Sequence, residues 1–205
     1  MKIAIIGAGK VGSALAEAWS KAGHEITLGL RDPNKPEIKK LIANLVNTTA
    51  TTPLTAADGA DVIVIAVPAT ALIEAAKSIG DAKNKLIIDC SNTIFVQLDG
   101  YDNGSTLIAD ITKSKRVVKC FNTCSSVLIG NATFGKSKAD TYMCGDDEEA
   151  KKIVNGLAID AGFERAVDCG GVENAKLLEQ LAGVVIGLFT KAGFSTNFSF
   201  KMLNK

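Results

Sequence analysis

Three glycines near the start of the chain have the spacing of a phosphate-binding turn. Gly7, Gly9 and Gly12 directly follow the apolar run 3–6, and helix-forming residues follow them at 13–22. In such a turn the first glycine allows a tight bend, the second lets a pyrophosphate approach the backbone, and the third lets the helix pack closely on the strand. The amides at the amino end of that helix would bind the pyrophosphate. The sequence therefore predicts a dinucleotide site formed by Gly7, Ala8, Gly9, Lys10, Val11 and Gly12.

The residues after the second expected strand distinguish between the two nicotinamide dinucleotides. This strand covers 25–30, and Arg31 and Asp32 follow it. An arginine here can form paired hydrogen bonds with the 2'-phosphate of NADP, whereas an acidic residue binds the 2'-hydroxyl of NAD. Asp32 is followed by Pro33 and Asn34, which is also typical of a turn. We therefore predict NADP(H) bound through Arg31, with NAD(H) as the alternative.

Apolar runs alternate with helical segments along the whole chain. The expected strands cover 3–6, 25–30, 47–51, 61–68, 85–89, 116–120, 139–144 and 163–168, and the expected helices cover 13–22, 36–46, 71–79, 105–111, a segment ending near 161, and 173–192. Residues 56–60 are expected to form a simple connector. The alternation predicts an α/β fold with a doubly wound, mostly parallel Rossmann sheet and a long C-terminal helix and tail. We expect one NAD(P)-binding domain over 1–205, with a dinucleotide-binding core at 1–125 and a C-terminal extension at 126–205.

Ligands of doubly wound sheets bind beyond the carboxyl ends of the strands, at the point where the strand order reverses. This rule adds a second set of cofactor contacts to the glycine turn and Arg31, namely Val67, Pro68, Ala69, Ser91, Asn92 and Asn122. Pro68, Asn122 and Thr123 are candidates for positioning a substrate. None of these residues is a strong acid or base, so no catalytic residue is assigned. The pattern favours hydride transfer, in which the protein mainly orients the two reacting molecules.

Composition argues against several other classes of function. The formal net charge is +1 with charges spread along the chain, so neither nucleic acid nor a membrane surface is an expected partner. No apolar stretch reaches the roughly 20 residues that span a bilayer, and no signal peptide is expected. Five cysteines without C-x-x-C spacing predict reduced thiols in a cytoplasmic protein. A redox pair or metal site at Cys120 and Cys124 is a minor alternative, which requires that the two face each other on a helix. The chain has a single histidine, His24, and the acidic run 146–149 is typical of a helix start. We therefore expect no metal site.

Two expectations concern the C-terminal part of the chain. Lys176 and Glu179 lie one helical turn apart, which is typical of a surface ion pair. Phe194, Phe198 and Phe200 in the tail predict burial against the body of the protein or against a partner subunit. On this basis we expect a homodimer.

Taken together, the motifs resemble the F420-dependent NADP oxidoreductases and their relatives over essentially the whole chain. The segments 5–12, 23–25, 29–31 and 66–68 are shared with many Rossmann enzymes, whereas 117–123, 143–147, 170–179 and 198–203 are more specific. The resemblance implies an NADP(H)-dependent oxidoreductase with Arg31 on the 2'-phosphate. It also implies hydride exchange with a flavin-like ring bound near Pro68 and Asn122.

The resemblance leaves the hydride acceptor open among FMN, FAD and coenzyme F420. Leu30 stands where the family commonly has a small hydroxyl or amide residue, and Asn122 and Thr123 stand where users of the deazaflavin coenzyme carry histidine. In this respect the chain is similar to the reductase domain of the STEAP metalloreductases. Two other functions remain as alternatives: an NADP(H)-dependent reductase of a small imine or hydroxyacid, and a non-catalytic NADP(H)-binding redox sensor.

Overall fold

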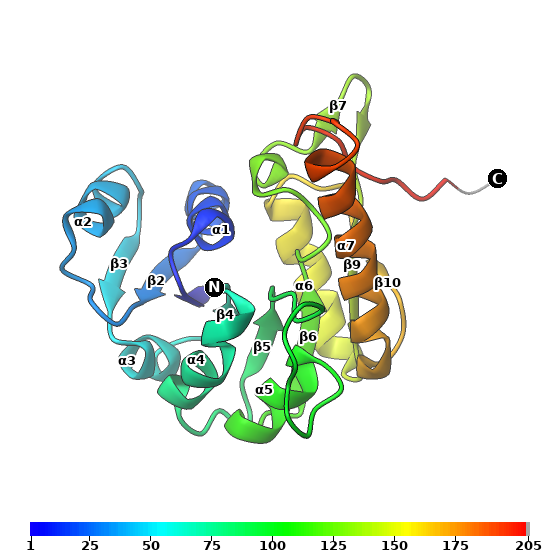
Figure 1. The fold of residues 1–205 in the computed structure, drawn as a ribbon. Helices are drawn as coiled ribbons and strands as arrows, with labels where there is room; N and C mark the ends of the chain where they lie inside the picture. Colours follow the sequence, from blue (N-terminus) through cyan, green and yellow to red (C-terminus); the bar gives the residue numbers. More distant parts are fainter. Residues whose placement is uncertain (204–205) are drawn as a thin grey trace.

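The computed structural model describes residues 1–203, so 204 and 205 at the end of the predicted tail lie outside the described part. Within it, eight strands form one sheet in the order β10-β9-β6-β5-β4-β1-β2-β3 (Figure 1). The strands are β1 (Lys2–Ile6), β2 (Glu25–Gly29), β3 (Thr48–Thr51), β4 (Val62–Ile65), β5 (Leu86–Asp89), β6 (Arg116–Cys120), β9 (Thr141–Gly145) and β10 (Ala166–Asp168). The helices are α1 (Lys10–Lys21), α2 (Pro36–Ala43), α3 (Pro53–Asp58), α4 (Leu72–Ile79), α5 (Gly104–Thr112), α6 (Glu148–Asp160) and α7 (Ala175–Thr190).

Both faces of the central strands are buried, as their continuous apolar composition requires. In β1, Ile3 and Ile5 pack with α1 and α6, whereas Ala4 and Ile6 pack with α3, α4 and α5. Figure 1 shows α3, α4 and α5 side by side along one face of the sheet. The predicted doubly wound α/β architecture is therefore confirmed.

One expected connector is a helix. The segment predicted as a loop at 56–60 lies largely within α3, whose first residue is Pro53 and whose N-cap is Thr52. The Thr52 hydroxyl oxygen accepts a hydrogen bond from the Thr55 amide at 3.4 Å. Proline at the first helical position and threonine before it form a recognised helix start. The prediction missed this signal because the helix has only 6 residues.

The last two strands run against the first six. The registers Val118↔Gly145 and Cys120↔Met143 show that β6 and β9 are antiparallel. The connection between them carries a short hairpin, β7 (Thr133–Phe134) with β8 (Ser137–Lys138), and no crossover helix that would return the chain to the starting edge. A strand that begins at the edge where its neighbour ended must run in the opposite direction.

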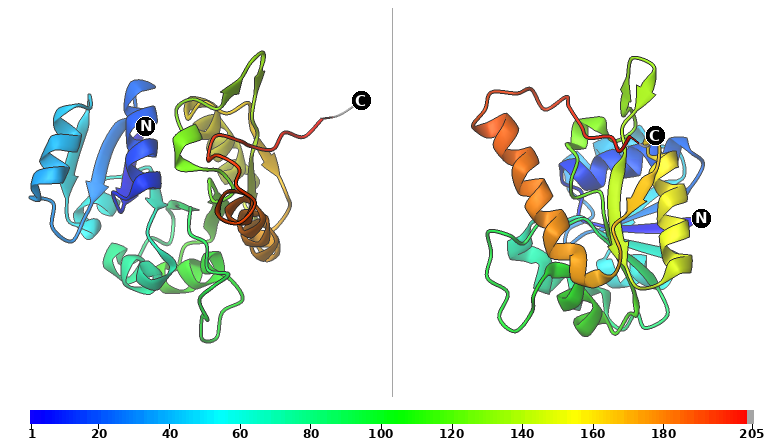
Figure 2. Two further views of the ribbon diagram at one scale, coloured as in Figure 1. Left: turned by 45° about the horizontal axis from the view of Figure 1, so that its top comes forward. Right: turned by 90° about the vertical axis from the view of Figure 1, so that its right-hand side faces the viewer.

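This reversal sets the path of α7. Because β10 pairs in parallel with β9, it also ends at the edge of the sheet where β6 begins. The chain then turns through η3 (Val172–Asn174) into α7, which runs back toward the other edge (Figure 2). The tail after α7 returns to β9, where the Asp140 amide donates to the Phe200 carbonyl at 3.3 Å. No helix in residues 1–203 combines the length and apolar character needed to cross a membrane.

Candidate functional site

The strand register brings the predicted site residues to one edge of the sheet. Ile6 pairs with Ile65, Ile65 with Asp89, and Asp89 with Lys119, so β1, β4, β5 and β6 end in one row. The strand order also reverses here, because the chain passes from β1 outward through β2 and β3 and then returns to β4 on the other side of β1. This is the switch point at which doubly wound sheets bind ligands.

The glycine turn has the backbone geometry that its spacing predicts. Gly7 has φ +103°, and a Cβ there would lie 2.6 Å from the Ala66 carbonyl oxygen. A Cβ on Gly12 would collide with the Gly7 carbonyl oxygen, so α1 can approach β1 only with glycine at this position. In contrast, a Cβ on Gly9 would meet no described atom within 4 Å. Gly9 is thus dispensable for packing and leaves room for a ligand beside the first amides of α1.

The remaining residues of the turn lie at the start of α1. Lys10 is exposed, whereas Ala8 and Val11 are half-buried and pack against the core. The Ser13 amide donates to the Gly9 carbonyl at 2.9 Å, and the Ser13 hydroxyl donates to the Ala8 carbonyl at 3.0 Å. These two bonds hold the turn in place without using the first amides of the helix, so those amides can bind a pyrophosphate.

At the end of β2, Arg31 and Asp32 have different surroundings. The Asp32 carboxylate accepts a hydrogen bond from the Asn34 amide at 3.1 Å, which is the turn geometry expected from the sequence. Arg31 is exposed and makes no hydrogen bond or ion pair with any residue of the described part. Its guanidinium can therefore reach a phosphate on the same edge.

Asn92 and Asn122, which follow β5 and β6, bind each other. The Asn92 side-chain amide donates to the Asn122 carbonyl at 3.1 Å, and the Asn122 side-chain amide donates to Asn92 Oδ1 at 3.0 Å. Asn122 Oδ1 and Thr123 Oγ1 are buried and lack a hydrogen-bond partner in the described structure. Buried polar atoms of this kind normally have a partner, so both atoms can bind a ligand at this edge.

The backbone before Asn122 is strained, which fixes the direction of this loop. Phe121 has φ +62°, a conformation that bulky side chains rarely adopt. Its ring is fully buried and packs edge-on against Trp19, with centroids 5.7 Å apart. This packing holds the turn that places Asn122 and Thr123 at the carboxyl edge.

The other predicted contacts differ in exposure. Pro68 is exposed, and Val67 and Ala69 are half-buried after β4. Ser91 is buried and directs its hydroxyl inward, where it donates to Asp89 Oδ1 at 2.6 Å. Its hydroxyl is thus used within the protein, although its backbone lies beside Asn92.

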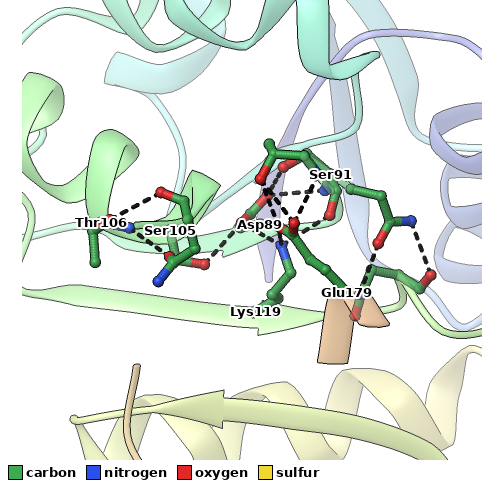
Figure 3. A network of polar contacts seen from close by, with 10 residues as sticks. Asp89, Ser91, Ser105, Thr106, Lys119 and Glu179 are labelled. Atoms are coloured by element: carbon green, nitrogen blue, oxygen red, sulfur yellow. Dashed lines mark hydrogen bonds and ion pairs between the residues drawn. The ribbon is translucent and has the colours of Figure 1, made fainter. Parts of the chain in front are cut away.

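A buried charge cluster, defined as Asp89, Lys119 and Glu179, lies behind these loops (Figure 3). Lys119 Nζ is 2.8 Å from Asp89 Oδ2 and 2.9 Å from Glu179 Oε1. The side chains of Asp89 and Lys119 are 0% exposed and that of Glu179 is 2% exposed. The expected surface pair of Lys176 and Glu179 is therefore wrong, because α7 turns Glu179 into the protein and leaves Lys176 exposed.

The cluster binds the neighbouring loops through further hydrogen bonds. Asp89 accepts from the Ser91 amide at 2.8 Å and from the Ser105 hydroxyl at 2.8 Å, and Glu179 accepts from the Thr93 amide at 2.9 Å. Burial alone would raise the pKa of Asp89, but Lys119 and Ser91 outweigh it and the pKa is lowered. Burial would lower the pKa of Lys119, but the two carboxylates outweigh it and the pKa is raised.

Sequence reasoning missed the cluster even though a signal was present. Lys119 interrupts a strand whose other central residues are buried on both faces, and a buried lysine requires a negative partner. Asp89 ends the neighbouring strand at the paired position. Glu179 had no comparable signal, because only the path of α7 brings it here.

The cysteines and the histidine have structural surroundings. Cys120 ends β6 and Cys124 lies in the following loop, so the two do not face each other on a helix as considered above. Burial raises the pKa of both thiols, that of Cys124 to about 12. His24 is buried, with Nε2 3.0 Å from Asp160 Oδ2, which agrees with its predicted structural role. No group of three metal-binding side chains occurs among residues 1–203.

These features define a Rossmann-type dinucleotide-binding protein with a second polar region beside the glycine turn. Comparison with known proteins shows which proteins the chain resembles. The family described as NADP oxidoreductase, coenzyme F420-dependent, matches residues 2–93. A curated F420-dependent NADP reductase of Methanothermobacter marburgensis is 28% identical over 93% of each chain. The chain is thus similar to the F420-dependent NADP oxidoreductases, and the predicted resemblance is confirmed.

Solved structures agree with this relationship. The crystal structure of a putative F420-dependent NADP reductase from Arthrobacter sp. FB24 has a TM-score of 0.88 and 27% identity, with both chains covered completely. An imine reductase from Aspergillus terreus shares the fold, with a TM-score of 0.69 and 20% identity. That likeness covers 94% of this chain and 63% of the imine reductase, which is correspondingly longer.

Proposed function

We propose that this protein is an oxidoreductase that transfers hydride between NADP(H) and a flavin-like ring, with coenzyme F420 as the first acceptor to test. The observation that carries the proposal is that two regions able to bind a ligand lie at the same edge of the sheet. The glycine turn has space at Gly9, and Asn122 and Thr123 have buried polar atoms without a partner in the described structure. The F420-dependent NADP reductases named above support the choice of both molecules.

Each group of residues has a distinct role in this proposal. The amides after Gly9 bind the pyrophosphate, and Arg31 binds the 2'-phosphate. Pro68, Asn92 and Asn122 lie on the half of the sheet that receives the nicotinamide, because each half of a doubly wound sheet binds one mononucleotide. The bound nicotinamide supplies the hydride chemistry, and the protein orients the two rings and excludes water.

The acceptor can be identified by following the loss of NADPH absorbance with F420, FMN and FAD added separately. We expect oxidation of NADPH with F420. Oxidation with FMN or FAD alone would retain the class of reductase and change the acceptor. Tight NADPH binding without turnover by any of the three would contradict the proposal and favour a redox sensor.

The choice of NADP(H) rests on Arg31 and can be tested by binding. Arg31→Ala should raise the Kd for NADPH by about tenfold, since one charge-assisted phosphate contact is worth about 1.5 kcal/mol or more. The Kd for NADH should stay unchanged. Lys39→Ala, which alters an exposed lysine on the nearby α2, is the matched control. Stronger binding of NADH than of NADPH by the unaltered protein would show that NAD(H) is the cofactor.

A reductase of a small imine or hydroxyacid is the second candidate. The fold shared with imine reductases favours it, although this chain spans only 63% of the length of that reductase. Such substrates are small, and a partner subunit would have to complete their site. NADPH oxidation with a cyclic imine and with none of the three ring acceptors would establish this alternative.

We also propose that the protein is a cytoplasmic homodimer with one domain, divided into a core at 1–125 and an extension at 126–205. The support for the dimer is an apolar face on α7, where Leu177 and Val184 are 59% and 55% exposed. In the tail, Phe198 and Phe200 are half-buried and Phe194 is exposed. Val184→Glu should convert a dimer into a monomer in light scattering after size exclusion. A monomeric unaltered protein would contradict this part.

The five unpaired cysteines agree with a reducing compartment.

A further inference from the structure

The buried charge cluster lies directly behind Asn92, on the half of the sheet assigned to the nicotinamide. Asn92 stands between two residues that the cluster holds. Lys119 Nζ donates to the Ser91 carbonyl at 2.8 Å, and the Thr93 hydroxyl donates to Glu179 Oε2 at 2.8 Å (Figure 3). The position of Asn92, and through it that of Asn122, therefore depends on this cluster.

The hydrogen bonds of the cluster define its charge. Both carboxylates are contacted by donors: Ser91, Ser105 and Lys119 donate to Asp89, and Thr93 and Lys119 donate to Glu179. Each of the four carboxylate oxygens faces an N–H donor, which can only donate: the Ser91 amide and Lys119 at Asp89, and the Thr93 amide and Lys119 at Glu179. Lys119 uses its three donors on Asp89, Glu179 and the Ser91 carbonyl. Two ionised carboxylates and one ammonium leave a buried net charge of −1.

We propose that this net negative charge makes the site favour the oxidised nicotinamide, whose ring is positively charged, over the neutral reduced ring. The inference rests on the proposed binding of NADP(H). Two unit charges near the protein interior interact through an effective dielectric constant of about 20 to 40, so one charge roughly 10 Å away changes an equilibrium by about four- to sixteenfold. Relative stabilisation of NADP⁺ makes bound NADPH a stronger hydride donor, which suits reduction of a second ring. Glu179 then acts as a positioning and electrostatic residue that need not touch the cofactor.

The test is the ratio of two dissociation constants, Kd(NADP⁺) divided by Kd(NADPH), measured by calorimetry. Glu179→Gln keeps the size of the side chain and removes its charge, so this ratio should rise by about fourfold or more. Thr93→Val is the matched control, because it removes a hydrogen bond to Glu179 and leaves the charge of the cluster unchanged. This control should retain the wild-type ratio even if both affinities fall. Glu179→Asp keeps the charge and should also retain the ratio.

Asp89→Asn provides a second, independent neutralisation and should shift the ratio in the same direction, which guards against poor folding of one variant. Thermal unfolding of each variant identifies the folded ones. An equal loss of affinity for NADP⁺ and NADPH, or no change in either, would overturn the inference and leave the proposed function intact. Failure of the wild-type protein to bind either nucleotide would overturn both.

Discussion

The two halves of the candidate site are built in different ways. At the end of β1, a stretch of six residues forms its shape from backbone conformation and from the absence of side chains, as at Gly7 and Gly12. At the ends of β5 and β6, the shape depends on side chains that are far apart in the chain. Asp89 and Lys119 are 30 residues apart, and Thr93 and Glu179 are 86 apart.

This difference has an energetic consequence. The glycine turn contains no buried charged group, because Lys10 is exposed. Substitutions in it therefore act through steric contacts or through direct loss of ligand binding. The buried charge cluster consists of groups that each destabilise the fold when they are buried alone. Removing one of them therefore leaves the others without a compensating charge and lowers the free energy of unfolding. We therefore expect the second half to be more sensitive to single substitutions than the first.

The largest effect is expected for Lys119→Met. This change leaves Asp89 and Glu179 buried without their cation, which should lower the free energy of unfolding by about 3 to 5 kcal/mol. Urea unfolding followed by circular dichroism measures it. Lys39→Met, on the exposed face of α2, is the control and should leave stability unchanged. A loss below about 1 kcal/mol for Lys119→Met would mean that the stability of the fold does not depend strongly on the buried charge cluster.

Gly12→Ala should have the next largest effect. The added Cβ collides with the Gly7 carbonyl oxygen, so α1 must move away from β1. Overpacking of this kind costs about 3 kcal/mol, which the midpoint of urea unfolding should show. An unchanged midpoint would show that the turn is more adaptable than its geometry indicates.

Gly9→Ala tests the same turn without affecting packing. Because a Cβ at Gly9 meets no described atom, the melting temperature should stay within a degree or so of the wild-type value. The Kd for NADPH should rise by about tenfold, since the methyl group occupies the space through which the pyrophosphate approaches the backbone. Calorimetric titration measures this change, and equal affinity for both proteins would place the pyrophosphate elsewhere.

The smallest effect is expected in the acid dependence of stability. The lowered pKa of Asp89 stabilises the fold at pH values above the unfolded pKa of about 3.9, and this contribution is lost as the pH falls through the lower folded value. Between pH 6 and pH 3 the wild-type protein should therefore lose more stability than Asp89→Asn. Urea midpoints at the two pH values measure the difference, and equal losses would show that Asp89 contributes no acid sensitivity.

The glycine turn could be predicted in detail because it depends on interactions between near neighbours in the sequence. Gly7 and Gly12 have the steric roles that their spacing indicates, and Gly9 has the open space beside it that a ligand would need. The order of strands and helices was also predictable from apolar runs, except for the short α3. The reversal at β9 was not, because local patterns do not encode whether a long connection crosses the sheet.

The sequence by itself determined the Rossmann core, the turn beside α1 and the position of Arg31 after β2, because short-range patterns decide where strands and helices begin and end. Tertiary structure decided that Glu179 is buried and that Lys119 binds two carboxylates. Both results follow from the antiparallel β9, which directs α7 back across the sheet. The physical reason is that the partner of a buried charge is chosen by the strand register and helix path, which bring distant residues within 3 Å of each other.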